Sequence, residues 1–228
     1  MEENNNQNNM ENNVESYKEE TVKTFNEVKE NLKNVDIKQE AQKGKSFLKD
    51  LWTNPIGKIK EIAKDETNSY FKTIILIIAL WCIVVDGKQI IGASSIKYLF
   101  KFNTIKSLLF TAIELIAEVV VLAAVVMFLN KEKKKSLVTA ITTIGTAKVP
   151  VVISAVLGLL YLISSNVGTI VAPARSLLTV ISMVLTYFAI KELFEIEEHE
   201  KAVKKFVFCM AAYEVVAIVF YLLGIYIY

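Results

Sequence analysis

Five long apolar stretches follow one another from residue 70 to residue 228, behind a polar head formed by residues 1–69. A bilayer core of about 30 Å requires about 20 apolar residues for each helical span, and several of these stretches reach that length with few charges. The sequence therefore predicts an all-α, polytopic membrane protein: a five-helix transmembrane bundle with a cytoplasmic amphipathic N-terminal region.

The predicted spans form one compact membrane domain over residues 70–228, which is too short for two such domains. The first span is the weakest, because Lys72 and Asp86 bracket only thirteen apolar residues. It reaches an adequate length if Lys72 snorkels to the membrane surface. The five spans are expected at residues 70–91, 107–129, 140–163, 170–190 and 206–228.

The polar head divides into a tail and a helical part. Residues 1–13 are rich in Asn and Glu and have little to bury, so we expect them to be disordered. Residues 14–69 are expected to form amphipathic, partly membrane-interfacial cytoplasmic helices. Over residues 14–42 the thin apolar stripe leaves two interpretations open, a short coiled coil or a solvated helix of marginal stability.

Residues 42–64 combine an apolar helical face with lysines, which is typical of a helix lying in the membrane interface. Residues 41–64 carry six lysines and two acids, whereas residues 1–40 carry ten acids and five lysines. Asn54 is a good N-cap and Pro55 suits a first helical position, so we expect two helices that meet at residues 53–55. The alternative is a soluble amphipathic helix docked on the membrane domain. The predicted lipid-interface residues are Lys43, Lys45, Lys49, Trp52, Lys58, Lys60 and Lys64.

Lysines in the short loops predict the orientation. With the N-terminus in the cytoplasm, twelve lysines near the spans lie inside, including the cluster at residues 131–135, and five basic residues lie outside. The positive-inside rule then places the N-terminus in the cytoplasm and the C-terminus outside a cell membrane. Residues 88–106, which are amphipathic, are expected to lie flat on the outer surface.

Ionisable residues occur inside the predicted spans, where each costs a few kcal/mol to insert and by default faces the bundle interior. Their axial positions predict two layers: one pairs Glu114 with Arg175, and the other pairs Lys148 with Glu118 or Glu214. One interpretation is a path for protons or ions through titratable carboxylates. The favoured interpretation is structural, with polar pairs that hold the helices in register. The predicted intramembrane polar network is Glu114, Glu118, Lys148, Arg175 and Glu214.

The third span is expected to form the centre of the bundle. Pro150 removes a backbone hydrogen bond and predicts a kink. Small residues are expected to give this helix one narrow side that a neighbour can approach closely. These small residues are Gly145, Ser154, Ala155 and Gly158.

Catalytic and metal-binding signatures are missing from the sequence. Cys82 and Cys209 have no Cys or His neighbour at metal spacing, and His199, the lone histidine, is expected to be a solvated loop residue. No Gly-rich phosphate loop or hydrolase motif is present, so we expect a protein that is not an enzyme and binds no cofactor or metal. The acidic loop around His199 is expected to contact the basic N-terminal helix. The expected partners are a bilayer with anionic headgroups and another copy or membrane protein, and not nucleic acid.

Two short passages resemble motifs of the Yip1 domain family, particularly its bacterial members. Asp50, Leu51, Trp52 and, after an extra residue, Pro55 resemble the D-L-Y-G-P motif before the first span. Residues 145–150, G-T-A-K-V-P, resemble the G-Y-S-L-V-P motif, with Thr146 in place of the tyrosine.

This resemblance implies five spans behind a cytoplasmic head. Eukaryotic members are trafficking factors that engage Rab-type GTPases and one another, whereas bacterial members have no settled activity. The function expected here is that of a membrane-organising or scaffold protein. The alternative is a small ion- or proton-coupled transporter or channel that uses Glu114, Glu118, Lys148 and Glu214.

Overall fold

The computed structural model describes residues 26, 36–92, 102–130, 135–162 and 165–222. Only the backbone is described for residues 37, 86–92, 102–115, 161–162, 165 and 220–222. The described chain is all-helical, which confirms the predicted class. Its helices are α2 (Ile37–Thr53), α3 (Pro55–Lys64), α4 (Phe71–Gly92), α6 (Phe102–Leu129), α7 (Leu137–Gly158), a 3-10 turn (Leu159–Leu162), α8 (Ser165–Leu193) and α9 (His199–Leu222).

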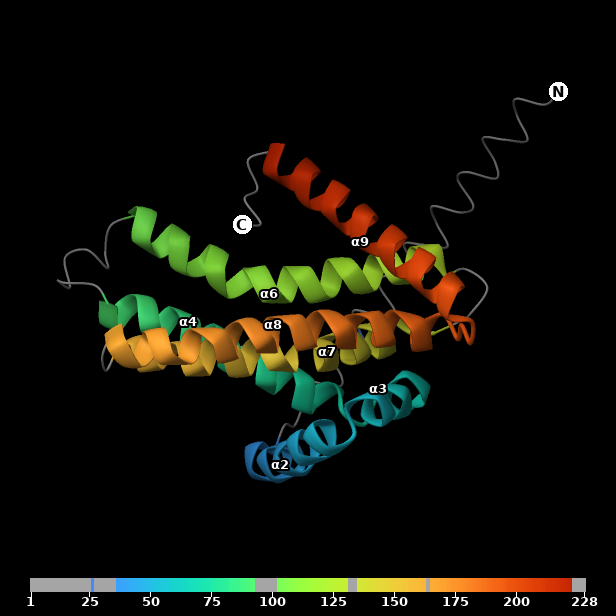
Figure 1. Cartoon of the computed structure of the whole chain (residues 1–228), viewed down its shortest axis with the longest axis horizontal. Helices are drawn as coiled ribbons and strands as arrows, with labels where there is room; N and C mark the ends of the chain where they lie inside the picture. Colours follow the sequence, from blue (N-terminus) through green and yellow to red (C-terminus); the bar gives the residue numbers. More distant parts are fainter. Residues whose placement is uncertain (1–25, 27–35, 93–101, 131–134, 163–164, 223–228) are drawn as a thin grey trace.

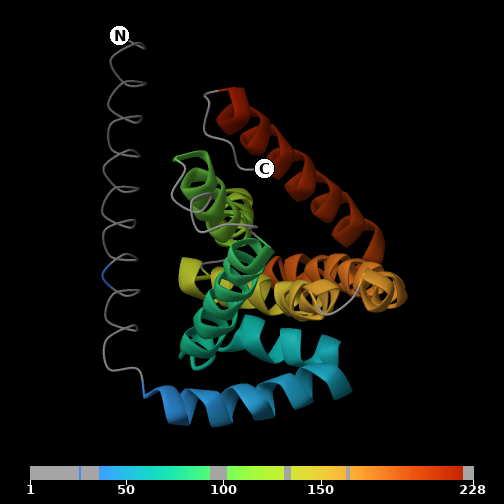
Figure 2. The same cartoon turned by 90° about the vertical axis from the view of Figure 1, so that its left-hand side faces the viewer.

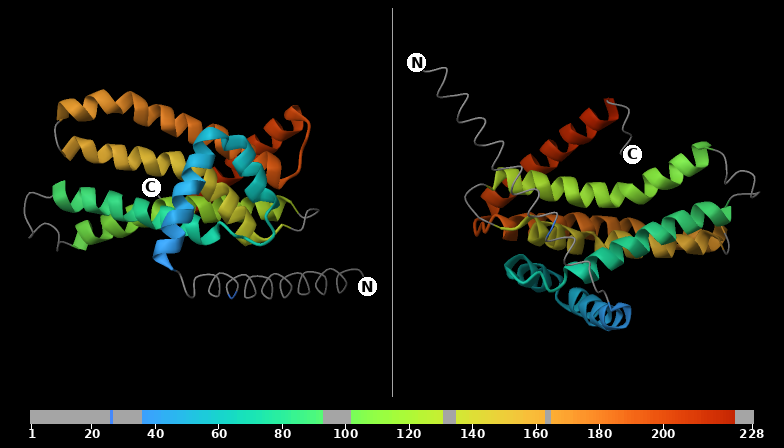
Figure 3. Two further views of the ribbon diagram at one scale, coloured as in Figure 1. Left: turned by 90° about the horizontal axis from the view of Figure 1, so that it is seen from below. Right: turned by 180° about the vertical axis from the view of Figure 1, so that it is seen from behind.

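Four long helices run roughly along the long axis of the molecule in alternating directions, as Figure 1 shows for α4, α6, α7 and α8. α2 and α3 lie across one side of this group, and α9 leaves it at a steep angle (Figure 2). α7 and α8 lie side by side for most of their length (Figure 3). α2 packs against α4, and α3 packs against α7 and α8, so the head is joined directly to the bundle.

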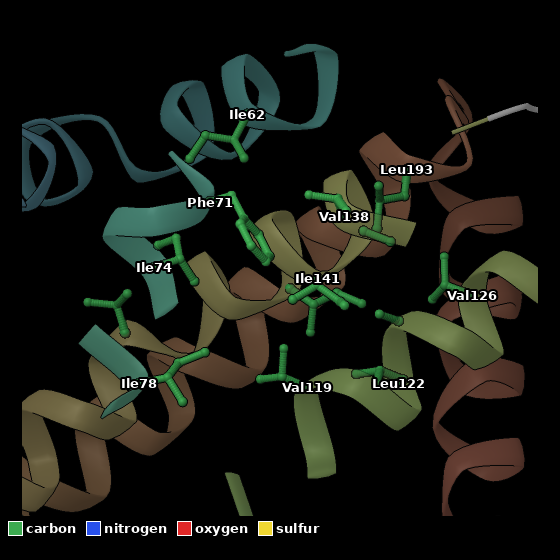
Figure 4. Packing of buried hydrophobic residues seen from close by; sticks show 14 of the residues in the cluster. Ile62, Phe71, Ile74, Ile78, Val119, Leu122, Val126, Val138, Ile141 and Leu193 are labelled. Atoms are coloured by element: carbon green, nitrogen blue, oxygen red, sulfur yellow. The ribbon is translucent and has the colours of Figure 1, made fainter. Parts of the chain in front are cut away.

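α7 is the central helix, as the sequence predicts. It packs against α3, α4, α6 and α8, and every residue from Val138 to Pro150 is buried. Ile74 and Ile78 of α4 reach it from one side, and Val119 and Leu122 of α6 reach it from another (Figure 4). These side chains pack α4 and α6 closely against α7, which places the centre of the core at this helix.

The small residues of α7 do not lie on one side of the helix, so the prediction of one narrow side is wrong. A Cβ added to Gly145 would lie 2.6 Å from Ile74 Cγ2 of α4, whereas one added to Gly158 would lie 3.2 Å from the Arg175 Cζ of α8. Gly145 and Ser154 are nine positions apart, and at about 100° per residue they point to opposite sides of the helix. α7 is therefore narrow toward two neighbours instead of one.

The helices are longer than most of the predicted spans. α6 begins at Phe102, α7 at Leu137, α8 at Ser165 and α9 at His199, and α8 continues through Pro173. Residues 88–92 belong to α4 and residues 102–106 to α6, so the predicted flat segment at residues 88–106 is wrong at both ends. Its middle part, residues 93–101, lies outside the described residues. The helix starts differ from the predicted spans because an apolar stretch shows only where the side chains are apolar. A helix continues through polar residues to a capping residue such as Ser136, whose side chain accepts from the Thr139 N–H.

Two of the described helices are long and apolar enough to cross a membrane: Leu137–Gly158 and Asn166–Leu193. The apolar parts of α4 and α6 with described side chains, Phe71–Val85 and Ile116–Leu129, are shorter. α8 carries large apolar side chains on its outside; Ile170 is 77% exposed and Leu177 is 60% exposed. Contiguous apolar surface of this kind marks contact with a membrane or another protein, and the two helices point to association with a membrane.

The head breaks at the predicted position. Asn54 ends α2, and its side chain accepts from the Gly57 N–H at the start of α3, where Pro55 is the first helical residue. The start of α2 differs from the prediction, because Asp36 caps the helix at Ile37, five residues before the expected residue 42. The predicted tail at residues 1–13, most of the predicted helix at residues 14–42, Lys131, Lys133, Lys134 and the last six residues lie outside the described residues.

Candidate functional site

A buried ion pair lies between α6 and α7. Lys148 Nζ donates to Glu118 Oε1, with Lys148 only 8% exposed and the Glu118 side chain 27% exposed. The sequence assigns Lys148 to Glu118 or Glu214, and the structure brings it to Glu118. Glu214 lies on the exposed surface of α9, and the side chain of Glu114 lies outside the described residues. A closed pair of opposite charges lowers the cost of burying either one.

Arg175 contacts the end of α7. Its Nε donates to the Ser154 carbonyl at 3.0 Å, and its guanidinium lies over Gly158, where a Cβ would come within 3.2 Å of Cζ. A cation at a helix C-terminus is favourable, because the last carbonyls there carry partial negative charge. The predicted pairing of Arg175 with Glu114 stays a prediction, because the side chain of Glu114 lies outside the described residues. Matching opposite charges along a sequence does not find a backbone carbonyl as a partner.

Hydroxyl groups fill the rest of the polar interior. Thr142, Thr143 and Thr146 are buried, and each donates to the carbonyl four residues earlier in α7 at 2.7 Å. Ser182 of α8 donates to the Ala147 carbonyl at 2.9 Å, which ties the two helices together. Pro150 lies inside α7, which continues to Gly158. These hydroxyls donate to backbone carbonyls of the protein, as is common between membrane helices.

Lys58 joins α3 to the start of α4. Its Nζ donates to Tyr70 Oη at 2.8 Å and to Glu61 Oε1 at 2.9 Å, and it lies 4.1 Å from the centre of the Tyr70 ring. Burial lowers the pKa of Lys58, but the hydrogen bonds to Tyr70 and Glu61 outweigh this, so its pKa is raised. Lys58 is only 4% exposed, so its predicted place in the lipid interface is wrong: it lies on the side of α3 that faces Tyr70.

Apolar contacts and two further polar contacts hold the head on the bundle. Ile59 packs with Ala147 of α7 and with Leu185 and Ala189 of α8. The polar contacts join Thr73 Oγ1 to Glu40 Oε2 at 2.7 Å and Thr139 Oγ1 to Asn68 Oδ1 at 3.0 Å. Within the head, Lys43 Nζ donates to the Ser69 carbonyl. α3 is thus docked on the bundle, as in the second interpretation of its sequence.

The turn before α4 is organised by Asp65. Its carboxylate accepts from the backbone N–H groups of Thr67 and Ser69 at 2.9 and 2.8 Å and from both hydroxyls. Burial raises the pKa of Asp65, but these hydrogen bonds outweigh it, so its pKa is lowered. A lowered pKa means that the carboxylate stabilises the fold at neutral pH, and that this contribution is lost as the pH falls below about 4 through the folded pKa.

The apolar face of α2 divides into a buried and an exposed part. Phe47 and Leu51 are buried against the bundle, whereas Leu48 is 39% exposed and Trp52 is 67% exposed. Residues 45, 48, 49 and 52 are spaced by three and four, so Lys45 and Lys49 share a stripe with Leu48 and Trp52. This set is called the basic aromatic stripe below. Lys60 and Lys64, two more predicted interface residues, are exposed on α3.

Polar contacts also connect α6, α8 and the loop before α9. Asn130 Nδ2 donates to the Leu193 carbonyl at 2.9 Å, and Lys135 pairs with Glu195 at 3.0 Å. The acidic loop therefore contacts the start of α7 through Glu195. His199 is the first residue of α9 instead of a loop residue, and its Nδ1 lies 3.1 Å from Tyr187 Oη. Among the described residues, no group of three or more His, Cys, Asp or Glu could hold a metal ion.

Replacing Lys58 tests the joint between head and bundle. We expect Lys58→Met to expose residues 53–70 to proteases severalfold more than in the parent protein, because the Tyr70 hydroxyl and the Glu61 carboxylate lose their buried partner, at about 1–3 kcal/mol. Limited proteolysis with identification of the cleavage sites measures this. The control is Lys60→Met on the exposed side of the same helix, and equal cleavage of the two variants would contradict the role of Lys58.

Comparisons with models of known protein families, with curated proteins and with solved structures find no match to this chain.

Proposed function

We propose that this chain is a five-span membrane protein of the Yip1 type, without enzymatic activity, that acts as a scaffold by holding a basic amphipathic head at the inner surface of a cell membrane. One observation carries the proposal: the head is docked on the bundle through Lys58 and Ile59 while its basic aromatic stripe stays exposed. A head that is fixed in this way presents lysines and a tryptophan at one constant depth. Residues of these types favour anionic headgroups and the interfacial layer.

Exposed apolar side chains support five spans. They occur on the outer surfaces of α4, α6, α8 and α9, where water would be costly. Examples are Ile83, Phe128, Leu177, Met183, Val207, Phe208, Val215 and Ile218. A bilayer around all these helices covers them, and the spans at 70–91, 107–129, 140–163, 170–190 and 206–228 remain our proposal, with the N-terminus inside and the C-terminus outside.

Helix lengths indicate how deep each part lies. α6 has 28 residues and α8 has 29, which correspond to about 42 and 44 Å, so they exceed a core of about 30 Å by roughly 12 and 14 Å. Leu185 and Ala189, which contact α3, lie about 12 and 6 Å from the end of α8 at Leu193. α3 therefore packs beside the inner end of the proposed span 170–190, which supports a place for the head close to the headgroups.

The ion pair lies toward the middle of the proposed spans. Glu118 lies about 16 Å from the end of α6 at Leu129, where the proposed span 107–129 also ends. A pair that closes between two neighbouring helices fits a structural part better than a path across the membrane. The alternative of a small transporter or channel predicts ion or proton flux into protein-containing vesicles, and we expect none.

A pair of single-tryptophan variants tests the placement of the head. Trp81→Phe leaves Trp52, which is 67% exposed on α2, and Trp52→Phe leaves Trp81, which is 7% exposed in the bundle. In vesicles of anionic lipid brominated near the headgroup, we expect the fluorescence of Trp52 to be quenched by more than half and that of Trp81 to change little. The matched control is the same pair in zwitterionic brominated lipid, in which quenching of Trp52 should be weaker.

The quenching of Trp52 distinguishes a head that lies in the membrane interface from one that faces water or protein. Quenching that depends on anionic lipid supports the scaffold proposal. Absence of quenching in a protein that is fully inserted would show that the basic aromatic stripe faces water or a protein partner, and would overturn the membrane role of the head.

A further inference from the structure

A groove of about 820 Å³ lies between α6 and α9, on the opposite side of α6 from its contact with the core. Every residue that lines it is Val, Ala, Leu or Phe. α9 leaves the end of α8 at a steep angle (Figure 2), and it packs against α6 beside the groove. The residues that matter most are Val120, Ala124 and Phe128 on α6 and Phe208, Ala211 and Val215 on α9.

Lysines continue the groove at one end. On α9, residues 204, 208, 211 and 215 are spaced by three and four, so Lys204 stands on the same face as Phe208, Ala211 and Val215. Lys205 is also exposed, three positions before Phe208, and its Nζ lies 5.2 Å from the centre of the Phe194 ring. Lys204 pairs with Glu200 at 2.5 Å, whereas no carboxylate in the described part of the chain pairs with Lys205.

We propose that this groove binds one acyl chain of an anionic phospholipid, with the phosphate at Lys205. The volume lies within the range of roughly 300–1,000 Å³ that ligand sites occupy. A lining of Val, Ala, Leu and Phe residues suits hydrocarbon. Lys205, three positions before Phe208, suits a phosphate, so tail and headgroup have complementary surroundings in the same order along α9. The inference rests on the proposed function, because it needs a bilayer around α6 and α9.

The test counts lipids on the intact protein by native mass spectrometry. The full chain is purified in detergent and supplied with phosphatidylglycerol or phosphatidylcholine that carry identical acyl chains. We expect one retained lipid, with phosphatidylglycerol preferred about fivefold, since one lysine near an anionic headgroup contributes about 1 kcal/mol. Lys205→Gln should remove this preference and leave binding of phosphatidylcholine unchanged.

Filling the groove tests where the lipid lies. Ala124 is exposed in the groove, so Ala124→Phe should abolish retention of the lipid without disturbing the core, and Ala211→Leu gives a milder version of the same change. The matched control is Ala174→Phe, which adds the same side chain to an exposed alanine of α8 that does not line the groove, and should keep the lipid.

Four outcomes would overturn the proposal. Retention of the lipid by Ala124→Phe and Ala211→Leu places it elsewhere, and equal retention of the two headgroups removes the role of Lys205. A parent dimer that becomes monomeric in Ala124→Phe, without a change in bound lipid, assigns the groove to a second copy. A gain of lipid on deletion of residues 223–228 assigns it to that segment. A chain that stays soluble without detergent would instead refute the proposed function itself.

Discussion

Glu118→Ala is expected to destabilise the helical bundle by about 3 kcal/mol, the largest effect of any single polar change that we predict. Lys148 is 8% exposed and donates to the Glu118 carboxylate, so the substitution leaves a buried cation without its partner. Breaking one side of a buried pair costs about 3–5 kcal/mol, and the lower end applies because Glu118 keeps part of its surface exposed. Unfolding by a denaturing detergent in mixed micelles, followed by near-UV circular dichroism, measures the loss.

A double-mutant cycle shows whether the loss belongs to the pair. Lys148→Met alone leaves a carboxylate without its cation, whereas the double variant Glu118→Ala/Lys148→Met removes both charges. We expect the double variant to recover at least half of the loss, with a coupling energy of about 1–3 kcal/mol. Glu197→Ala, at an exposed carboxylate of the loop before α9, is the control and should change stability by no more than about 0.5 kcal/mol.

Two results would contradict this account. Additive effects of Glu118→Ala and Lys148→Met would show that the two charges do not depend on each other. Proton or ion flux through the parent protein in vesicles, lost in the isosteric variant Glu118→Gln, would favour the transporter over the scaffold.

Gly145→Val is expected to destabilise the protein by about 2–3 kcal/mol, because it forces α4 away from α7. Even a Cβ at this position would lie 2.6 Å from Ile74 Cγ2 and 3.4 Å from Ile78 Cδ1, and both isoleucines are buried. Overpacking of a close helix contact typically costs about 1–3 kcal/mol, and a branched side chain lies at the upper end. The same detergent unfolding experiment measures the effect.

Gly44→Ala is the matched control on another helix. A Cβ there would lie 3.6 Å from Thr73 Cγ2, which is an ordinary contact, so this change should leave stability unchanged or raise it by up to about 1 kcal/mol through helix propensity. Ile74→Ala should partly rescue Gly145→Val by opening the space that valine needs. Unfolding of Gly145→Val that matches the parent protein would show that α4 and α7 are not held by this contact.

Local rules recovered the features that depend on neighbouring residues in the chain. The break at Asn54 follows from the capping preference of Asn and the fixed backbone of Pro, and both act within one helical turn. The central position of α7 could also be predicted, since its small and polar residues suit contact with other helices and not with lipid. The helix starts were missed because capping residues such as Ser136, and not the end of the apolar run, decide them.

Features that depend on distant partners could not be predicted in the same way. Lys58 resembles other interfacial lysines in the sequence, and only its contact with Tyr70, in a segment folded back beside α3, makes it a buried residue. Arg175 also donates to a backbone carbonyl, and a sequence carries no signal for a contact of that kind. The error about the small residues of α7 has another cause. The angle between Gly145 and Gly158 follows from helix geometry alone, so it could have been predicted from the sequence.

The enclosed position of α7 has a consequence for biogenesis. During synthesis α4 and α6 precede α7, so the groups that cover two of its sides, including Glu118, are already made when Lys148 and the buried threonines emerge. A translocating machinery that meets α7 alone would handle an apolar segment with an unpaired lysine, whereas one that keeps α6 nearby offers Lys148 its counter-ion at the moment of entry. Membrane insertion of α7 should therefore depend on the residues of α6. In a cell-free insertion assay, the efficiency with which α7 inserts should change when α6 is changed.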